Sequence, residues 1–112
     1  MIDNELQQIE SNLKRNAVLT ELGNALARLK GNRDFKKVIL EGFFGDEAIR
    51  LVHLKADPNM QGSDSQKAIL IQMDAIGALR QYLETLAQLA GMAQKSIEAD
   101  EQTRDELLAE GL

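Results

Sequence analysis

Apolar residues recur at alternating steps of three and four along the second half of the chain. The pattern is unbroken from Ile76 to Ile97 and extends back through Met73 to Ile69. Its members are Ile69, Met73, Ile76, Leu79, Leu83, Leu86, Ala90, Ala93 and Ile97. This is the spacing of the a and d positions of a heptad repeat, which form one apolar stripe along an α-helix. We call these residues the seam, and a stripe of this length must be buried against another helix.

The seam belongs to one long helix, predicted over residues 66–106, because no proline interrupts that stretch. A helix of about forty residues spans about 60 Å at 1.5 Å per residue. A compact domain of this size is only about 26 Å across. The far end must therefore project or pair with another chain. Gly77 and Gly91 within this helix each predict either a close approach of another helix or a bend.

A second long helix is predicted over residues 3–30, capped by Asp3 or Asn4 and ended by Gly31. Its apolar residues change face near Asn16. One face carries Ile2, Leu6, Ile9 and Leu13. The nearly opposite face carries Leu19, Leu22, Leu26 and Leu29. We expect one continuous helix whose halves pack on different neighbours, so that residues 1–16 can project. The alternative is a frayed N-terminal end.

Two short helices are expected between the long ones. Asn32 or Asp34 begins the first, about 34–44, which Gly45 ends, and Asp46 caps the second, about 47–56. These helices hold all three phenylalanines and should form the thickest part of the core. The loop over 56–65 partly follows the spacing of a calcium-binding loop. Its twelfth position is Ala68 where a bidentate glutamate is required, so a plain connection is expected.

Together these elements predict an all-α fold, a long helical hairpin or bundle forming a single domain over residues 1–112. We expect a homo-oligomer, with an interface formed by the seam and by Ile2, Leu6, Ile9 and Leu13. The competing arrangement is a monomeric bundle, in which the face from Leu19 to Leu29 packs antiparallel on the last helix. The excess helix length favours the oligomer.

The net charge of −5 belongs entirely to residues 98–112. The rest of the chain holds twelve acidic and twelve basic residues. The C-terminal segment has Arg104 against six acids, which are Glu98, Asp100, Glu101, Asp105, Glu106 and Glu110. This acidic face is a predicted binding surface for a basic partner, and such binding would be sensitive to salt.

Residues for catalysis or metal binding are scarce. The chain has no cysteine, and its one histidine, His53, has no second ligand or nucleophile to join it. No serine lies in a nucleophile elbow, and no glycine-rich phosphate loop follows a strand. We therefore predict no enzyme activity, no metal and no cofactor.

Basic residues from Arg28 to Lys37 precede the two short helices, which permits a helix-turn-helix reading. The second of those helices leaves little polar surface to read a DNA groove, so nucleic-acid binding is the least favoured function. The N-terminus lacks the pattern of a signal peptide, and no run of about 18 apolar residues could span a membrane. We expect a cytoplasmic protein with no membrane partner.

Three stretches carry a family resemblance: NRDFKKVILEGFF at 32–44, RLVHLKADP at 50–58 and DAIGAL at 74–79. They resemble small helical proteins encoded by tailed bacteriophages, and the likeness covers about residues 19–98. The resemblance implies a virion-assembly, head-associated or scaffold-like component, found in the host cytoplasm or in the virion. The alternative that it implies is a small inhibitor or adaptor of a host protein, which would bind through the acidic face. It carries over no functional residue.

Overall fold

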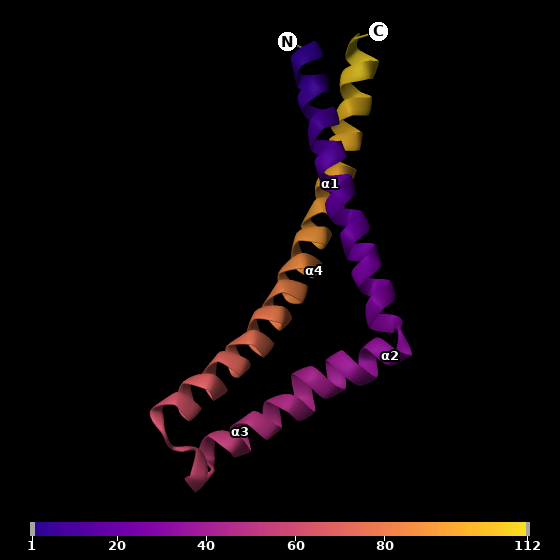
Figure 1. Cartoon of the computed structure of the whole chain (residues 1–112). Helices are drawn as coiled ribbons and strands as arrows, with labels where there is room; N and C mark the ends of the chain where they lie inside the picture. The colour runs from indigo at the N-terminus through magenta and orange to yellow at the C-terminus, as the bar shows by residue number, and fades with distance from the viewer. Residues whose placement is uncertain (1, 112) are drawn as a thin grey trace. The chain divides into compact units, whose positions relative to one another are not determined.

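The structure is a computed structural model that describes residues 2–111. Met1 and Leu112, the ends of the predicted domain, lie outside the described residues. The elements in chain order are α1 (Ile2–Gly31), α2 (Arg33–Phe35), the π-helix η1 (Lys36–Glu47), α3 (Ala48–Ala56), the 3₁₀-helix η2 (Pro58–Met60) and α4 (Ser63–Gly111) (Figure 1). No strand occurs between residues 2 and 111, which confirms the all-α prediction.

Both long helices are continuous. The helix predicted over 3–30 is α1, and it runs through Asn16 without a break to Gly31. Asn32 then caps the next helix, because its Oδ1 accepts a hydrogen bond from the Phe35 N–H at 2.9 Å. The helix predicted over 66–106 is α4, which is longer than expected at both ends.

The expected boundary between the two short helices is wrong. Gly45 lies inside η1, and Ala48 follows Glu47 with the helical torsion angles φ −61° and ψ −42°. The chain is therefore helical without interruption from Arg33 to Ala56, with a wide π segment in its middle. Runs of π-helix as long as η1 are rare, since most are single turns inside α-helices.

The connection between α3 and α4 is held by side chains. The Asp57 Oδ1 accepts a hydrogen bond from the Asn59 N–H at 2.8 Å. The Gln61 amide donates to the Lys55 and Asp57 carbonyls at 2.9 and 2.7 Å. The Gln66 amide donates to the Lys55 and Met60 carbonyls at 3.0 and 2.7 Å. These bonds satisfy carbonyls at the end of α3 that would otherwise lack a partner.

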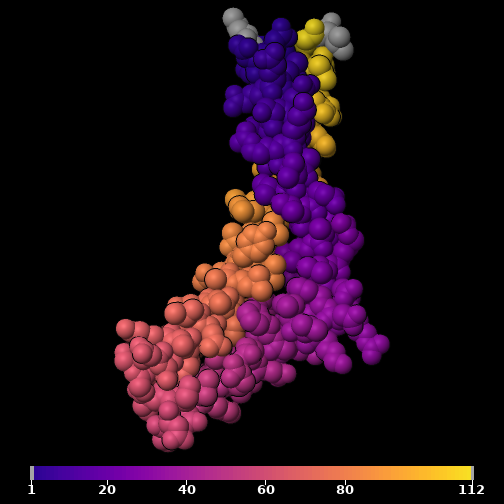
Figure 2. All heavy atoms as spheres, in the orientation of Figure 1, coloured from indigo at the N-terminus to yellow at the C-terminus, as the bar shows by residue number. Residues whose placement is uncertain are grey.

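The described chain divides into two compact units. The first consists of residues 2–26 and 85–111, and the second of residues 27–84. In the first unit the start of α1 lies antiparallel beside the end of α4, as the indigo and yellow segments in Figures 1 and 2 show. Within residues 2–111, no helix is both long and apolar enough to cross a membrane.

Each unit has its own buried residues. In the second unit Leu51, Ile69 and Ile76 form a core, and other apolar residues pack against it: Phe43, Phe44, Ala48, Leu54, Met60 and Met73. The rings of Phe43 and Phe44 have centroids 5.9 Å apart. Two of the three phenylalanines of the expected thick core thus pack in it, and Phe35 is not among them. In the first unit the buried residues are Ile9, Leu26 and Ala93.

Candidate interaction surface on helix α4

The chain itself covers most of the seam. Ile69 and Ile76 are buried in the core of the second unit, and Ala93 is buried in the first unit. The other members are half-buried, except for Leu79, which is exposed; they are Met73, Leu83, Leu86, Ala90 and Ile97. The buried side chains have almost no area left to offer a second copy.

The expected change of face along α1 is found only in part. Ile9 is buried and Leu6 and Leu13 are half-buried, whereas Ile2 is exposed. The same stripe then continues at the heptad spacing through three half-buried residues that are polar or small, namely Asn16, Thr20 and Gly23. Of the leucine face expected to replace it, Leu26 is buried and Leu19 half-buried, but Leu22 and Leu29 are exposed. Sequence reasoning missed the continuation because it followed only apolar residues.

The close approach of two helices occurs at Gly23. A Cβ atom placed on Gly23 would collide with the Cβ of Ala90, whereas a Cβ on Gly77 or Gly91 would meet nothing within 4 Å. The helices leave a hollow of about 270 Å³ nearby, lined by Thr20, Gly23, Asn24, Ala87, Ala90, Gly91 and Gln94. The Thr20 hydroxyl oxygen is buried there without a hydrogen-bond partner among the described residues.

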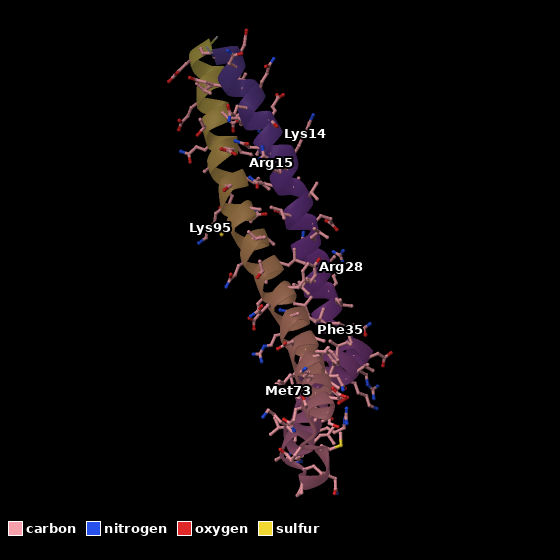
Figure 3. All side chains as sticks on the ribbon, turned by 60° about the vertical axis from the view of Figure 1, so that its left-hand side comes forward. Lys14, Arg15, Arg28, Phe35, Met73 and Lys95 are labelled. Atoms are coloured by element: carbon pink, nitrogen blue, oxygen red, sulfur yellow. The ribbon has the colours of Figure 1, made fainter. Side chains whose placement is uncertain are left out.

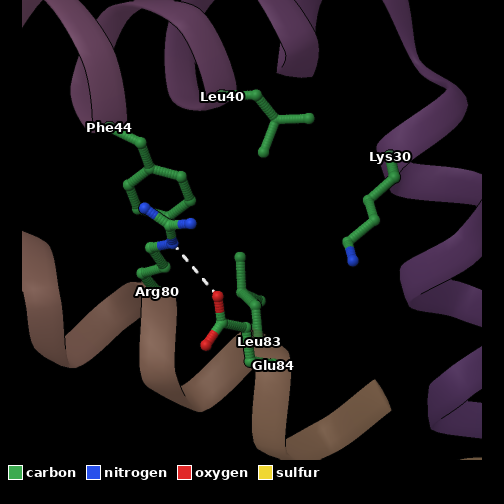
Figure 4. Close-up of a pocket in the computed structure, with 6 residues that line it drawn as sticks. All are labelled: Lys30, Leu40, Phe44, Arg80, Leu83 and Glu84. Atoms are coloured by element: carbon green, nitrogen blue, oxygen red, sulfur yellow. Dashed lines mark hydrogen bonds and ion pairs between the residues drawn. The ribbon is translucent and has the colours of Figure 1, made fainter.

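A second hollow, of about 330 Å³, lies in the second unit (Figure 4). Its lining residues are Lys30, Leu40, Phe44, Arg80, Leu83 and Glu84. The Arg80 Nε donates to Glu84 Oε1 at 3.1 Å, and both side chains are more than half exposed. An ion pair exposed to this degree contributes about 1 kcal/mol or less. The lining contains no serine, cysteine or histidine.

The basic segment is exposed, and the helix-turn-helix that its sequence permitted is not formed. Arg28, Lys30, Arg33, Lys36 and Lys37 all have exposed side chains. Because η1 continues directly into α3, the turn that a helix-turn-helix requires is absent. Arg50 on α3 is paired with Glu47 at 2.5 Å, and His53 is exposed on the same helix. Among residues 2–111, no three His, Cys, Asp or Glu side chains are grouped as a metal site.

The acidic face lies on the last turns of α4. Asp100 is half-buried, and the other five acids are exposed: Glu98, Glu101, Asp105, Glu106 and Glu110. Two of them accept hydrogen bonds from glutamines one turn away, Glu98 from Gln94 at 3.5 Å and Glu106 from Gln102 at 3.2 Å. Asp105 lies 3.6 Å from the Nε of Arg104. Most of the negative charge thus remains open to solvent.

A second heptad stripe runs along α4, and from Ala75 to Ser96 each of its members directly precedes a residue of the seam. We call it the outer stripe, and it consists of Ile71, Ala75, Ala78, Tyr82, Thr85, Leu89, Met92, Ser96 and Ala99. A shift of one residue is a rotation of about 100° around a helix, so the outer stripe lies on a face beside the seam. Every member is exposed and none is charged. Ile71 is 68% exposed, Tyr82 59% and Met92 64%.

Contiguous exposed apolar patches often mark interaction sites. Lys95, which is next to the outer stripe, points away from α1 in the first unit (Figure 3). Sequence reasoning missed the stripe although its spacing is visible in the sequence. The signal is weak because five of the nine positions are Ala, Thr or Ser.

Comparisons with protein-family models, with curated proteins and with solved structures find no match. The function is therefore inferred from the surfaces of the chain itself.

Proposed function

We propose that the protein is a non-enzymatic helical assembly protein that works as a multimer and associates with further copies through α4. The outer stripe is the observation that supports this proposal. Its large members Ile71, Tyr82, Leu89 and Met92 are between 42% and 68% exposed to solvent. Burial of an apolar side chain of this size contributes about 1.5–3 kcal/mol, which favours association of that stripe.

The assembly role is of the kind that the resemblance to small bacteriophage proteins implies, a scaffold-like or head-associated component. Such a role needs a repeated contact between identical chains and no chemical site. A long helix with one apolar stripe used inside the chain and another, exposed stripe beside it suits that purpose. The first stripe supports the fold and the second remains available for association.

The molar mass in solution tests this proposal. Light scattering of the purified protein over a wide range of concentration should give a defined multiple of the 12.4 kDa chain mass. The multimer should dissociate on dilution, because association through one helical face is reversible. A mass of 12.4 kDa at every concentration would overturn the proposal.

The acidic face supports a second candidate, an adaptor that binds a basic protein. Glu98, Glu101 and Asp105 are exposed within two turns of α4, and most of their charge is not paired. Such a face would bind by attraction between opposite charges, weakening as salt is added. Under this candidate the multimer is not required for function.

Neutral variants separate the two candidates. A triple variant, Glu98→Gln, Glu101→Gln and Asp105→Asn, should bind a polylysine peptide more weakly than the wild type and keep the multimer. The matched control is Glu5→Gln, Glu10→Gln and Asp46→Asn, which removes equal charge from exposed positions elsewhere. Equal loss of binding in both variants would mean that net charge, and not the acidic face, binds the peptide.

A further inference from the structure

We infer that the outer stripe pairs with the outer stripe of a second copy, in antiparallel orientation, with Asp74 of each copy beside Lys95 of the other. This inference rests on the proposed self-association, and it specifies the contact. It depends on the continuity of α4, which runs without a break from Ser63 to Gly111. Each half of the pairing joins residues 71–82 of one copy to residues 85–96 of the other.

The sizes of the side chains select the register. In an antiparallel pair of helices each a position lies opposite a d position of the partner, and close packing requires large residues to face small ones. In one register every layer joins a large side chain to a small one. Its layers are Ile71 with Ser96, Ala75 with Met92, Ala78 with Leu89 and Tyr82 with Thr85. The twofold axis between the copies repeats each layer, so the sequence is complementary to itself.

The charges beside the stripe select the same register independently. Residues 71–99 carry five charges, at Asp74, Arg80, Glu84, Lys95 and Glu98. Only Asp74 and Lys95 lie at the positions that flank the stripe on its polar side, immediately before Ala75 and Ser96. In this register Asp74 of one copy and Lys95 of the other are offset by two residues, which is about 3 Å along the helix axis. Two ion pairs between the copies result, with Gln81 and Gln88 facing each other between them.

Other registers and orientations fit less well. A shift by one heptad sets Tyr82 against Met92 and Ala75 against Ala99, so that large faces large and small faces small. It also sets Asp74 against Gln102 and removes both ion pairs. A parallel pairing places every residue opposite itself, which leaves gaps at Ala75 and Ala78 and crowds Tyr82.

Other exposed apolar faces are shorter. On α1, exposed Val18, Leu22 and Leu29 follow a heptad spacing, but Arg15 precedes them at the same spacing. On α3 only Ile49 and Val52 are exposed large apolar residues. Neither face has an order of large and small side chains that is complementary to itself. The outer stripe has such an order, and this identifies a second copy as its partner.

Charge reversal tests the ion pairs. Asp74→Lys and Lys95→Asp each replace two attractive contacts by two repulsive ones, so each variant alone should dimerise roughly tenfold or more weakly than the wild type. A mixture of the two variants should recover the wild-type affinity, because both contacts in the mixed pair are attractive again. Glu98→Lys is the control, since it makes the same charge change as Asp74→Lys at a position away from the flank. Single variants that dimerise like the wild type, or a mixture that gains nothing, would overturn the register.

Cysteine cross-linking tests the orientation in a chain that has no cysteine of its own. The double variant Ala78→Cys with Leu89→Cys should form disulfide-linked dimers on oxidation. The two positions are eleven residues apart on one helix, about 16 Å, too far for a bond within one chain. The out-of-register control, Ala75→Cys with Leu89→Cys, should cross-link much more slowly. Dimers formed readily by Ala78→Cys alone would show a parallel pairing and overturn the inference.

The proposed pairing and the proposed function can fail separately. A wild-type multimer that ignores the charge reversals and the cross-links would overturn this pairing and leave the proposed function standing. A wild-type chain that is monomeric at every concentration would overturn both the pairing and the proposed function. This outcome is also the one expected if a foreign helix, and not a second copy, covers the outer stripe.

Discussion

Gly23 and Gly91 have opposite environments in the first unit. A side chain at Gly23 would collide with Ala90, whereas a side chain at Gly91 would project into open space. Glycine inside a helix is less favourable than alanine by about 0.5–1 kcal/mol, because it loses more backbone freedom on folding. At Gly23 that cost is compensated by the close approach of α1 to α4. At Gly91 no contact compensates it.

We therefore expect opposite effects from the same substitution. Gly23→Ala should lower the free energy of unfolding by about 1–3 kcal/mol, since overpacking forces the helices apart. Gly91→Ala should raise it by about 0.5–1 kcal/mol through helix propensity. Urea unfolding followed by circular dichroism, at equal protein concentrations, measures both. Equal effects of the two substitutions would show that α1 does not approach α4 at Ala90.

The buried hydroxyl of Thr20 makes a separate prediction. Its oxygen has no hydrogen-bond partner among the described residues, and an unsatisfied polar group of this kind costs about 1–3 kcal/mol. Thr20→Val keeps the shape and removes the hydroxyl, so it should raise the unfolding free energy by about 1 kcal/mol. Thr20→Ser keeps the hydroxyl and loses the methyl group, and it should lower the same quantity. A destabilised Thr20→Val variant would mean that the hydroxyl is bonded, for example to a water in the adjoining hollow.

Single residues limited what the sequence could predict about α1. Its continuity and its end at Gly31 followed from the absence of proline and from the glycine itself. The course of its buried face did not, because Asn16, Thr20 and Gly23 carry no apolar signal. They lie at the interface because small side chains allow α1 and α4 to approach closely, a property of the pair of helices that the sequence of one helix does not contain.

Among the elements, η1 departs most from expectation. Gly45 followed by Asp46 is a common helix stop followed by a common cap, yet the chain stays helical through both. Local preference is weak compared with burial, and Phe43, Phe44 and Leu51 all pack in one core. The wide turns of the π-helix also bring Gly42 close to the Lys37 carbonyl, which would lie 3.1 Å from a Cβ atom at Gly42.

The two glycines of η1 should therefore respond differently to alanine. Gly45→Ala places its methyl group in open space and should raise the unfolding free energy by about 0.5–1 kcal/mol. Gly42→Ala presses its methyl group on a backbone carbonyl, and it should give no gain or a loss of up to about 1 kcal/mol. Thermal unfolding of the two variants side by side measures the difference. A gain at Gly42 equal to that at Gly45 would show that this segment adopts ordinary α-helical turns.

Helix α4 shows how much of an element a periodic pattern predicts. The seam gave its existence, approximate extent and buried side, and all three agree with the structure. What covers that side was left open by the pattern, between a second copy, which the length of the helix favoured, and the first long helix of the same chain. The outer stripe had the same spacing, but a stripe that is half alanine, threonine and serine becomes noticeable only when the structure shows that its large members are exposed.

At the scale of the whole molecule, the chain has two small sets of buried residues. The second unit is built on Leu51, Ile69 and Ile76, and the first has Ile9, Leu26 and Ala93. The second unit also contains Phe43 and Phe44, which bury large apolar areas, so it should be the more stable of the two. Helix α4 contributes to both units, and unfolding of one unit need not unfold the other.

Removal of the Leu51 side chain distinguishes one cooperative unit from two. Leu51 is fully buried, so Leu51→Ala should lower the stability of the second unit by about 2–5 kcal/mol. The neighbouring Val52 is 54% exposed, and Val52→Ala, the matched control, should change stability by less than about 0.5 kcal/mol. Native-state hydrogen exchange should then show faster exchange of amides in α3 and in residues 63–84, with little change in residues 98–111. Equal loss of protection in both segments would show that α4 transmits the defect and that the two units unfold together.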